Sequence, residues 1–174
     1  MIDKISVTGK IGFEPENKTK KHNVQSSWKR MAMVHIDGDV AEYYAWFIKK
    51  RFNLELNRPL RGSHITFIND SIKDLSGNGI KTMEEVNATW NAVKAKWDKK
   101  RISLILDLNP RTDDRTWWLN IPQEERELLQ GVRNELGLGQ PFWGLHMTIG
   151  TAEHLRYEHS VYIHNLIKKG FITT

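Results

Sequence analysis

Apolar and polar residues alternate in several short stretches of the chain, and this period of two is typical of half-buried β-strands. The alternation predicts strands over residues 5–8, 28–36, 63–68, 116–121 and 144–149. Residues 102–108 form a nearly continuous apolar run, which predicts a well-buried strand. Gly9 and Gly12 follow the first alternating stretch, and we expect them to end that strand.

Three segments carry apolar residues at helical spacing instead. The first follows Asp39, a residue type that commonly caps helices. The second opens with a capping box at residues 82–85 and carries an aromatic stripe that we interpret as core. The third is opened by Pro122 and ended by Gly137. The apolar positions of the three predicted helices are Val40, Tyr43, Tyr44, Phe47 and Ile48; Val86, Trp90, Val93 and Trp97; and Leu128, Leu129, Val132 and Leu136.

One nine-residue pattern occurs twice along the chain. Residues 59–67 read Pro-Leu-Arg-Gly-Ser-His-Ile-Thr-Phe, and residues 141–149 read Pro-Phe-Trp-Gly-Leu-His-Met-Thr-Ile. Each copy follows a predicted strand and an amphipathic helix, so the sequence indicates a duplicated strand–helix–strand unit at about 28–69 and 116–150. A single His-x-Thr match occurs often by chance, whereas two matches within one pattern are a strong signal.

The spacing places the polar residues of each motif on one face of its strand. Residues two apart in a strand point the same way, so His64 projects with Thr66, and His146 with Thr148. Units packed about a pseudo-twofold axis would bring the two pairs together across a cleft. Two imidazoles that flank a phosphate can act as general base and general acid, and threonine hydroxyls can donate hydrogen bonds to its non-bridging oxygens. The four residues therefore predict an active site for phosphodiester chemistry.

Two other interpretations of the histidines stay open. Each could be a half-buried polar residue of a strand, which suits a lone histidine better than a matched pair. Histidine is also a common metal ligand, but the chain has no cysteine, no HExxH motif and no tight Asp/His cluster. His154, His159 and His164 recur every five residues, a spacing that fits no helix face. We therefore expect neither a metal site nor a cofactor.

Composition limits the domain number, the partners and the cellular location to be expected. The chain has 174 residues, of which 39% are hydrophobic, and this length favours a single domain spanning 1–174, with two small lobes as the alternative. A formal net charge of +5 suits a phosphate-bearing partner. The absence of cysteine fits a reducing compartment. No apolar run approaches the ~20 residues of a membrane helix, and the N-terminus lacks a signal-peptide pattern. We expect a cytoplasmic protein with no membrane association, and we infer no stable protein partner.

The paired His-x-Thr-apolar motifs on a duplicated strand–helix–strand unit resemble the two-histidine (2H) phosphoesterase superfamily. The resemblance covers the architecture of the whole chain and, in residue detail, the two motifs. It implies an α+β, bilobal fold in which duplicated strand–helix–strand units with antiparallel sheets surround a central cleft. Known members include RNA ligase T-like proteins, RNA 2′,3′-cyclic phosphodiesterases and an snRNA-processing exonuclease.

Within that superfamily the chain looks most similar to phage anti-CBASS enzymes, which degrade the cyclic oligonucleotides that alert a bacterial immune system. The likeness rests on the compact size, the basic stretch at 14–27 and the 109–121 hairpin with Trp117 and Trp118. Ligase-like members often carry Arg or an aromatic residue shortly after the second motif, where this chain has Ile-Gly-Thr-Ala. If phage-encoded, such an enzyme would act in the host cytoplasm.

The resemblance implies metal-free cleavage of 3′–5′ bonds in cyclic di- or trinucleotides, such as cyclic GMP-AMP, by the substrate's own 2′-hydroxyl. A 2′,3′-cyclic phosphate would form and then open to a 3′-phosphate. The histidines would serve as base and acid, and the threonines would bind the scissile phosphate. Bases would stack on tryptophans beside the cleft, and basic residues would meet further phosphates. Our candidates for these contacts are Trp28, Trp118, Trp143, Arg61 and Lys21.

Two other functions remain compatible with the sequence. An RNA-end enzyme acting on 2′,3′-cyclic or 2′–5′ phosphodiesters would use the same four residues, but it would need an open basic track. A catalytically inactive module that only binds nucleotides would keep the aromatic cleft and tolerate loss of a motif histidine. The sequence does not separate base from acid or specify the preferred nucleotide.

Overall fold

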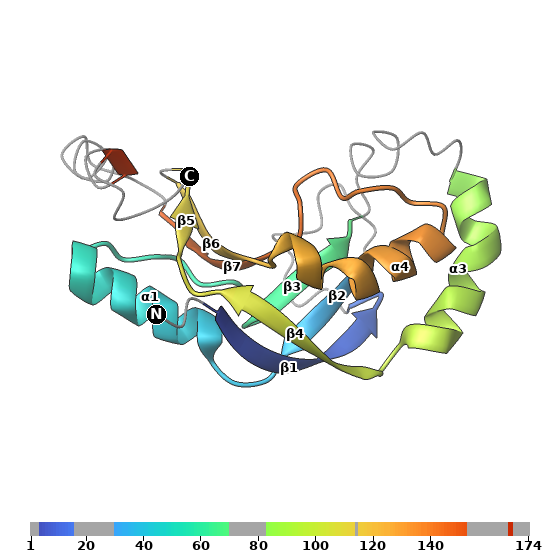
Figure 1. Ribbon diagram of the computed structural model, residues 1–174, viewed down its shortest axis with the longest axis horizontal. Coiled ribbons are helices and arrows are strands. Elements are labelled where there is room, and N and C mark those ends of the chain that lie inside the picture. The colour runs from blue at the N-terminus through green and yellow to red at the C-terminus, as the bar shows by residue number, and fades with distance from the viewer. Residues whose placement is uncertain (1–3, 16–29, 70–82, 114, 153–166, 169–174) are drawn as a thin grey trace.

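The computed structural model describes residues 4–15, 30–69, 83–113, 115–152 and 167–168. Helices are interspersed among the strands along this part of the chain (Figure 1). The strands are β1 (Lys4–Phe13), β2 (Ala32–Ile36), β3 (His64–Ile68), β4 (Arg101–Asp107), β5 (Arg111–Thr112), β6 (Thr116–Asn120) and β7 (His146–Thr151). The helices are α1 (Val40–Phe52), α3 (Met83–Trp97) and α4 (Glu127–Glu135), and a 3₁₀ turn, η2 (Gln123–Glu125), precedes α4.

All the strands join one curled sheet in the order β4-β1-β2-β3-β7-β6-β5. Every neighbouring pair in that order is antiparallel. The α+β class expected from the sequence is confirmed. The expected separate sheets are instead one continuous sheet, because β3 and β7 pair at Ile65 and Met147.

Apart from the edge strand β4, the two halves of the sheet have the same order of strands from the outside to the centre. A hairpin, a helix and an inner strand form β1-β2-α1-β3 in the first half, and β5-β6-α4-β7 repeat that sequence in the second. Each helix also reaches the other half, since α1 packs against β7 and α4 against β3. Phe52 of α1 stacks on Trp117 of β6 with ring centroids 5.6 Å apart. The two halves therefore share one hydrophobic core.

A buried arginine strengthens the link between the halves. Arg133 of α4 is 0% exposed, and its Nη1 donates a hydrogen bond of 2.7 Å to the carbonyl oxygen of Phe67 on β3. Its Nε donates a second bond, of 2.8 Å, to the carbonyl oxygen of Gly139. Hydrogen bonds from a charged donor are worth about 1.5–3 kcal/mol each. One guanidinium thus ties the end of β3 to the loop that leads into the second motif.

The first strand does not end at its glycines, contrary to expectation. β1 continues through Gly9 and Gly12 to Phe13. A Cβ on Gly9 would lie 2.6 Å from the carbonyl oxygen of His35, and one on Gly12 would lie 3.2 Å from the ring of the same histidine. Glycine is needed here because a neighbouring strand approaches closely. In the sequence alone, a glycine of this kind cannot be told from one that ends a strand.

Three other local expectations are wrong in part. The run at 102–108 forms β4, which lies at the edge of the sheet, so only Leu104 and Leu106 are buried. Asp39 precedes α1 without a side-chain cap. The hydroxyl of Ser63 accepts a 2.9 Å hydrogen bond from the Ala41 amide instead. Pro122 opens the 3₁₀ turn, and α4 follows it.

The aromatic stripe of α3 lies largely in the core, as expected. Trp90 and Val93 are buried, and Trp97 packs partly against the core. Trp90 also donates a 2.7 Å hydrogen bond from Nε1 to the carboxylate of Glu14. The predicted capping box lies outside the described side chains. Among the described residues, no helix is both long and apolar enough to cross a membrane.

Candidate active site

Each motif begins with the same turn. The amide of Gly62 donates to the carbonyl of Pro59 at 3.1 Å, and the amide of Gly144 donates to the carbonyl of Pro141 at 3.1 Å. Both glycines have positive φ, 65° for Gly62 and 70° for Gly144. An L-residue pays about 1–2 kcal/mol in this conformation. The proline and glycine of the repeated pattern are therefore turn residues that deliver each histidine at the start of its strand.

Backbone carbonyls of these turns hold both imidazoles. Nδ1 of His64 lies 2.9 Å from the carbonyl oxygen of Gly62. Because a carbonyl oxygen only accepts, Nδ1 carries the proton, and Nε2 of the neutral ring is left to accept one. The backbone groups of Trp143 and Gly144 act on the ring of His146 and raise its pKa. The repeat thus extends from sequence to hydrogen bonding.

The β3–β7 register brings the two motifs together. Ile65 is opposite Met147, which places His64 opposite Thr148 and Thr66 opposite His146. Directly opposed residues of an antiparallel pair point to the same face. Ile65 and Met147 are buried in the core, whereas the four motif residues are half-buried on the other face. Diagonal neighbours lie about 7–8 Å apart, so the two histidines can flank a group the size of a phosphate.

Burial lowers the pKa of both histidines below the ordinary imidazole value. For His64, the carbonyl of Gly62 partly offsets this effect and the nearby charge of Arg61 adds to it. For His146, the carbonyls of Trp143 and Gly144 oppose the burial, and the charge of His64 lowers the pKa further. Because the charge of His64 acts on His146, the apparent pKa values in a titration describe the pair of rings and not either one alone.

These lowered pKa values predict that kcat/KM is greatest at acidic pH. A pair working as base and acid needs one neutral and one protonated imidazole, so kcat/KM follows a bell whose limbs are the two macroscopic pKa values of the free enzyme. Both pKa values are lowered, so we expect the maximum below about pH 6.5, the ordinary imidazole value. A bound phosphodiester anion favours the imidazolium, so the kcat optimum should lie at higher pH. A kcat/KM that rises steadily from about pH 5 to about pH 9 would instead indicate a hydroxide nucleophile.

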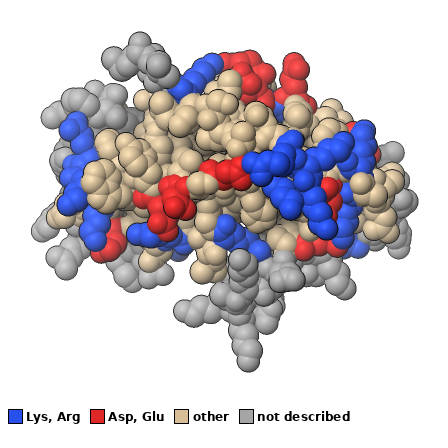
Figure 2. All heavy atoms as spheres, turned by 90° about the horizontal axis from the view of Figure 1, so that it is seen from below, with Lys and Arg blue, Asp and Glu red and all other residues tan. Residues whose placement is uncertain are grey.

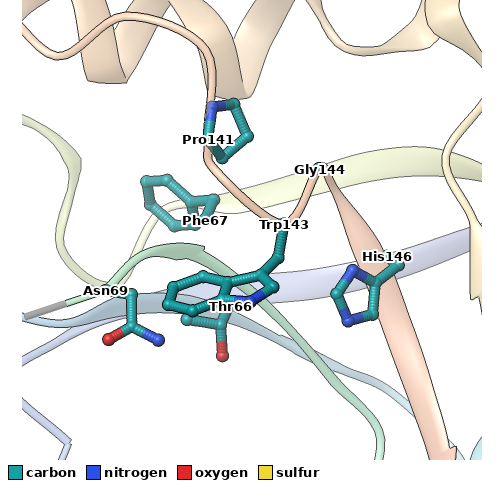
Figure 3. Close-up of a pocket in the computed structure, with 7 residues that line it drawn as sticks. All are labelled: Thr66, Phe67, Asn69, Pro141, Trp143, Gly144 and His146. Atoms are coloured by element: carbon teal, nitrogen blue, oxygen red, sulfur yellow. The ribbon is translucent and has the colours of Figure 1, made fainter. Parts of the chain in front are cut away.

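A pocket of about 220 Å³ opens beside the paired motifs (Figure 3). Thr66, Asn69, Trp143 and His146 are among the residues that line it. In Figure 3 the indole of Trp143 lies between the side chains of Asn69 and His146. Trp143 is 50% exposed, so one wall of the pocket is an accessible aromatic face next to a motif histidine.

The candidate binding residues occupy different positions around this site. Trp118 is opposite Thr148, and its ring meets that of His146 edge-on at 6.1 Å. Its Nε1 donates a 3.0 Å hydrogen bond to Asn120. Arg61 and Trp143 hold equivalent positions in the two turns; the charge of Arg61 acts on His64, and Trp143 lines the pocket. Trp28 and Lys21 lie outside the described residues.

The sheet brings further polar residues to the same face, and the motifs do not reveal them. His35 is opposite His64 on β2, and Asn120 is opposite His146 on β6. Asn69 follows β3 and lines the pocket. His35 and Asn120 carry no motif of their own, and their place depends on strand pairing. The alternation in each predicted outer strand could have placed both on the polar face, but not beside the motifs.

Within the part of the chain that the structure describes, no three His, Cys, Asp or Glu side chains gather where they could hold a metal ion. No family model, curated protein or solved structure matches the chain. The paired motifs and their geometry are thus the observations from which a function can be argued.

Proposed function

We propose that this protein is a metal-independent phosphodiesterase of the two-histidine type. The observation that carries the proposal is the register of β3 and β7, which sets two His/Thr pairs diagonally across two adjacent strands on one face. Each hydroxyl stands beside the imidazole of the other half. A phosphate between them would have one imidazole on either side, as in-line displacement requires, and hydroxyls directed at its non-bridging oxygens.

The reaction follows from this arrangement. One imidazole removes the proton of the ribose 2′-hydroxyl, whose oxygen attacks the neighbouring phosphorus. The other imidazole protonates the departing 5′-oxygen as the P–O bond breaks, which leaves a 2′,3′-cyclic phosphate. Water then adds to that phosphorus with the two proton transfers reversed, and a 3′-phosphate results. Thr66 and Thr148 donate hydrogen bonds to the charge that accumulates on the phosphoryl oxygens.

The favoured substrate is a cyclic di- or oligonucleotide. The accessible indole of Trp143 beside His146 suits the stacking of a base, a contact worth about 1–3 kcal/mol and tolerant of base identity. Cleavage of such a messenger would disarm a bacterial CBASS response. An RNA-end phosphodiesterase is the second candidate, since linear RNA needs positive surface charge and the chain carries a formal net charge of +5, with Lys and Arg side chains clustered on one face (Figure 2).

A substrate panel with EDTA present tests both the chemistry and the substrate. Cyclic GMP-AMP should be cleaved faster than an RNA ending in a 2′,3′-cyclic phosphate, and chelation should change neither rate, because imidazoles alone can transfer protons to and from oxygen. Product mass spectrometry and initial rates provide the measurement.

Complete loss of activity in EDTA, restored by a divalent ion, would refute the metal-independent mechanism. Preference for the RNA end would select the second candidate. Tight binding of cyclic GMP-AMP without any turnover would identify a nucleotide-binding module instead.

A further inference from the structure

The polar face that carries the four motif residues continues beyond His64 onto β2 and β1. His35 is opposite His64, and Lys10 is opposite His35 on β1. The amide of Ile36 donates to the carbonyl of Ser63, so the His35–His64 pair, one residue further along each strand, is a non-hydrogen-bonded pair. Side chains approach most closely in such pairs. His64, His35 and Lys10 therefore form a continuous row on one face.

Gly12 leaves room for the imidazole of His35. A Cβ at Gly12 would lie 3.2 Å from Cδ2 and 3.3 Å from Nε2 of that ring. His35 is half-buried, so it is held against the sheet rather than extended into solvent. An imidazole in this position can donate a hydrogen bond to an anion that lies over β1 and β2.

Positive charge gathers at the same end of the row. Arg101 is opposite Lys10, and Lys99 and Lys100 immediately precede it. Figure 2 shows that Lys and Arg side chains cluster on the face seen from below, beside acidic side chains. Arg101 is paired with Asp37, which also accepts a 2.6 Å hydrogen bond from Thr8. Lys10 is exposed and forms no ion pair with any described residue.

The pocket beside Trp143 is too small for a whole dinucleotide. Its volume is about 220 Å³, below the roughly 300–1,000 Å³ of typical ligand pockets. It suits one nucleoside beside the reacting phosphate, so the rest of a dinucleotide would extend over the neighbouring surface. Lys10 is two strands from His64, or about 10 Å at ordinary strand spacing, and its long side chain can extend toward His64.

We propose that Lys10 and His35 form a second phosphate subsite, which binds the non-reacting phosphate of a substrate with at least two phosphodiester groups. The inference rests on the proposed function, because it takes the His64/His146 site as the place of reaction. Lys10 supplies charge, and His35 supplies a fixed hydrogen-bond donor. The subsite selects cyclic dinucleotides over cyclic mononucleotides.

The test compares two substrates that share the reacting phosphate. Lys10→Ala should raise KM for cyclic GMP-AMP about tenfold with kcat unchanged, and it should leave KM for 2′,3′-cyclic AMP unaltered, since that ligand has no second phosphate. The salt dependence of dinucleotide binding should lose about one unit of slope. His35→Asn should act in the same direction. Lys50→Ala, an equal charge change on exposed α1, is the matched control.

Equal effects of Lys10→Ala on both substrates, or an effect no larger than that of Lys50→Ala, would overturn the subsite. A binding measurement by calorimetry in a His146→Ala background separates this result from failure of the proposed reaction. If wild-type protein cleaves neither substrate, a tenfold loss of cyclic GMP-AMP affinity on Lys10→Ala, with 2′,3′-cyclic AMP unaffected, still supports the subsite. Unchanged affinity for both ligands, or no binding of cyclic GMP-AMP, refutes it.

Discussion

His64→Ala and His146→Ala are each expected to reduce kcat for cyclic GMP-AMP by about 10²–10⁴-fold, the usual contribution of a general acid or base. Both side chains are half-buried on the face opposite the core, so neither substitution should unfold the protein. Substrate affinity should change little, because the threonines and the aromatic wall remain. The measurement is single-turnover kinetics alongside calorimetric binding and thermal unfolding.

The double variant gives the sharper test. Residues that act as one unit are strongly non-additive, so His64→Ala/His146→Ala should be hardly slower than the worse single variant. Lys50→Ala serves as a surface control with wild-type kinetics. If the two single effects multiply in the double variant, the histidines act independently, and the shared-site interpretation fails.

A cyclic dinucleotide with 2′-deoxyribose at the attacked linkage should bind and resist cleavage. The chain has no cysteine, and the motif threonines stand where they would hold phosphoryl oxygens. The 2′-hydroxyl is already tethered next to the phosphorus, and such intramolecular attack gains an effective concentration of up to about 10⁵–10⁸ M. We expect a drop in rate of at least about 10³-fold, and inhibition by the analogue with Ki near the KM of the ribose substrate.

Mass spectrometry of wild-type digests checks the same step from the product side. A 2′,3′-cyclic phosphate should accumulate transiently and then convert to a 3′-phosphate. The dinucleotide with deoxyribose only at the other linkage is the matched control, and it should be opened once at the ribose side. Rapid cleavage at the deoxy linkage would exclude 2′-hydroxyl attack and require direct attack by water.

The local patterns of the sequence predicted the face of each motif residue correctly. Ile65 and Met147 are buried, and the His and Thr residues beside them are half-buried on the other side, because a period of two is enough to assign faces. The sequence of a single segment does not specify which strand it pairs with or in which register. The opposition of His35 to His64 depends on the register of β2 and β3, so the residue was missed.

The errors share a cause. The role of glycine in β1 and the burial of apolar residues in β4 both depend on neighbouring strands. At Gly9 a neighbouring strand approaches closely, and β4, which contains Leu106, lies at the edge of the sheet. The absent cap at Asp39 is similar, since Ser63 from another strand supplies the oxygen. Local propensity cannot anticipate a partner that is distant along the chain.

Helices α1 and α4 and the guanidinium of Arg133 oppose separation of the two halves of the fold. α1 packs across onto β7, α4 packs across onto β3, and Arg133 ties Phe67 to Gly139, so separating the halves would expose core on both sides at once. Among the described residues, these contacts hold the two motifs together across the centre of the sheet. The proposed phosphodiesterase reaction would then take place at groups that are aligned before the substrate binds, without closure of two lobes around it.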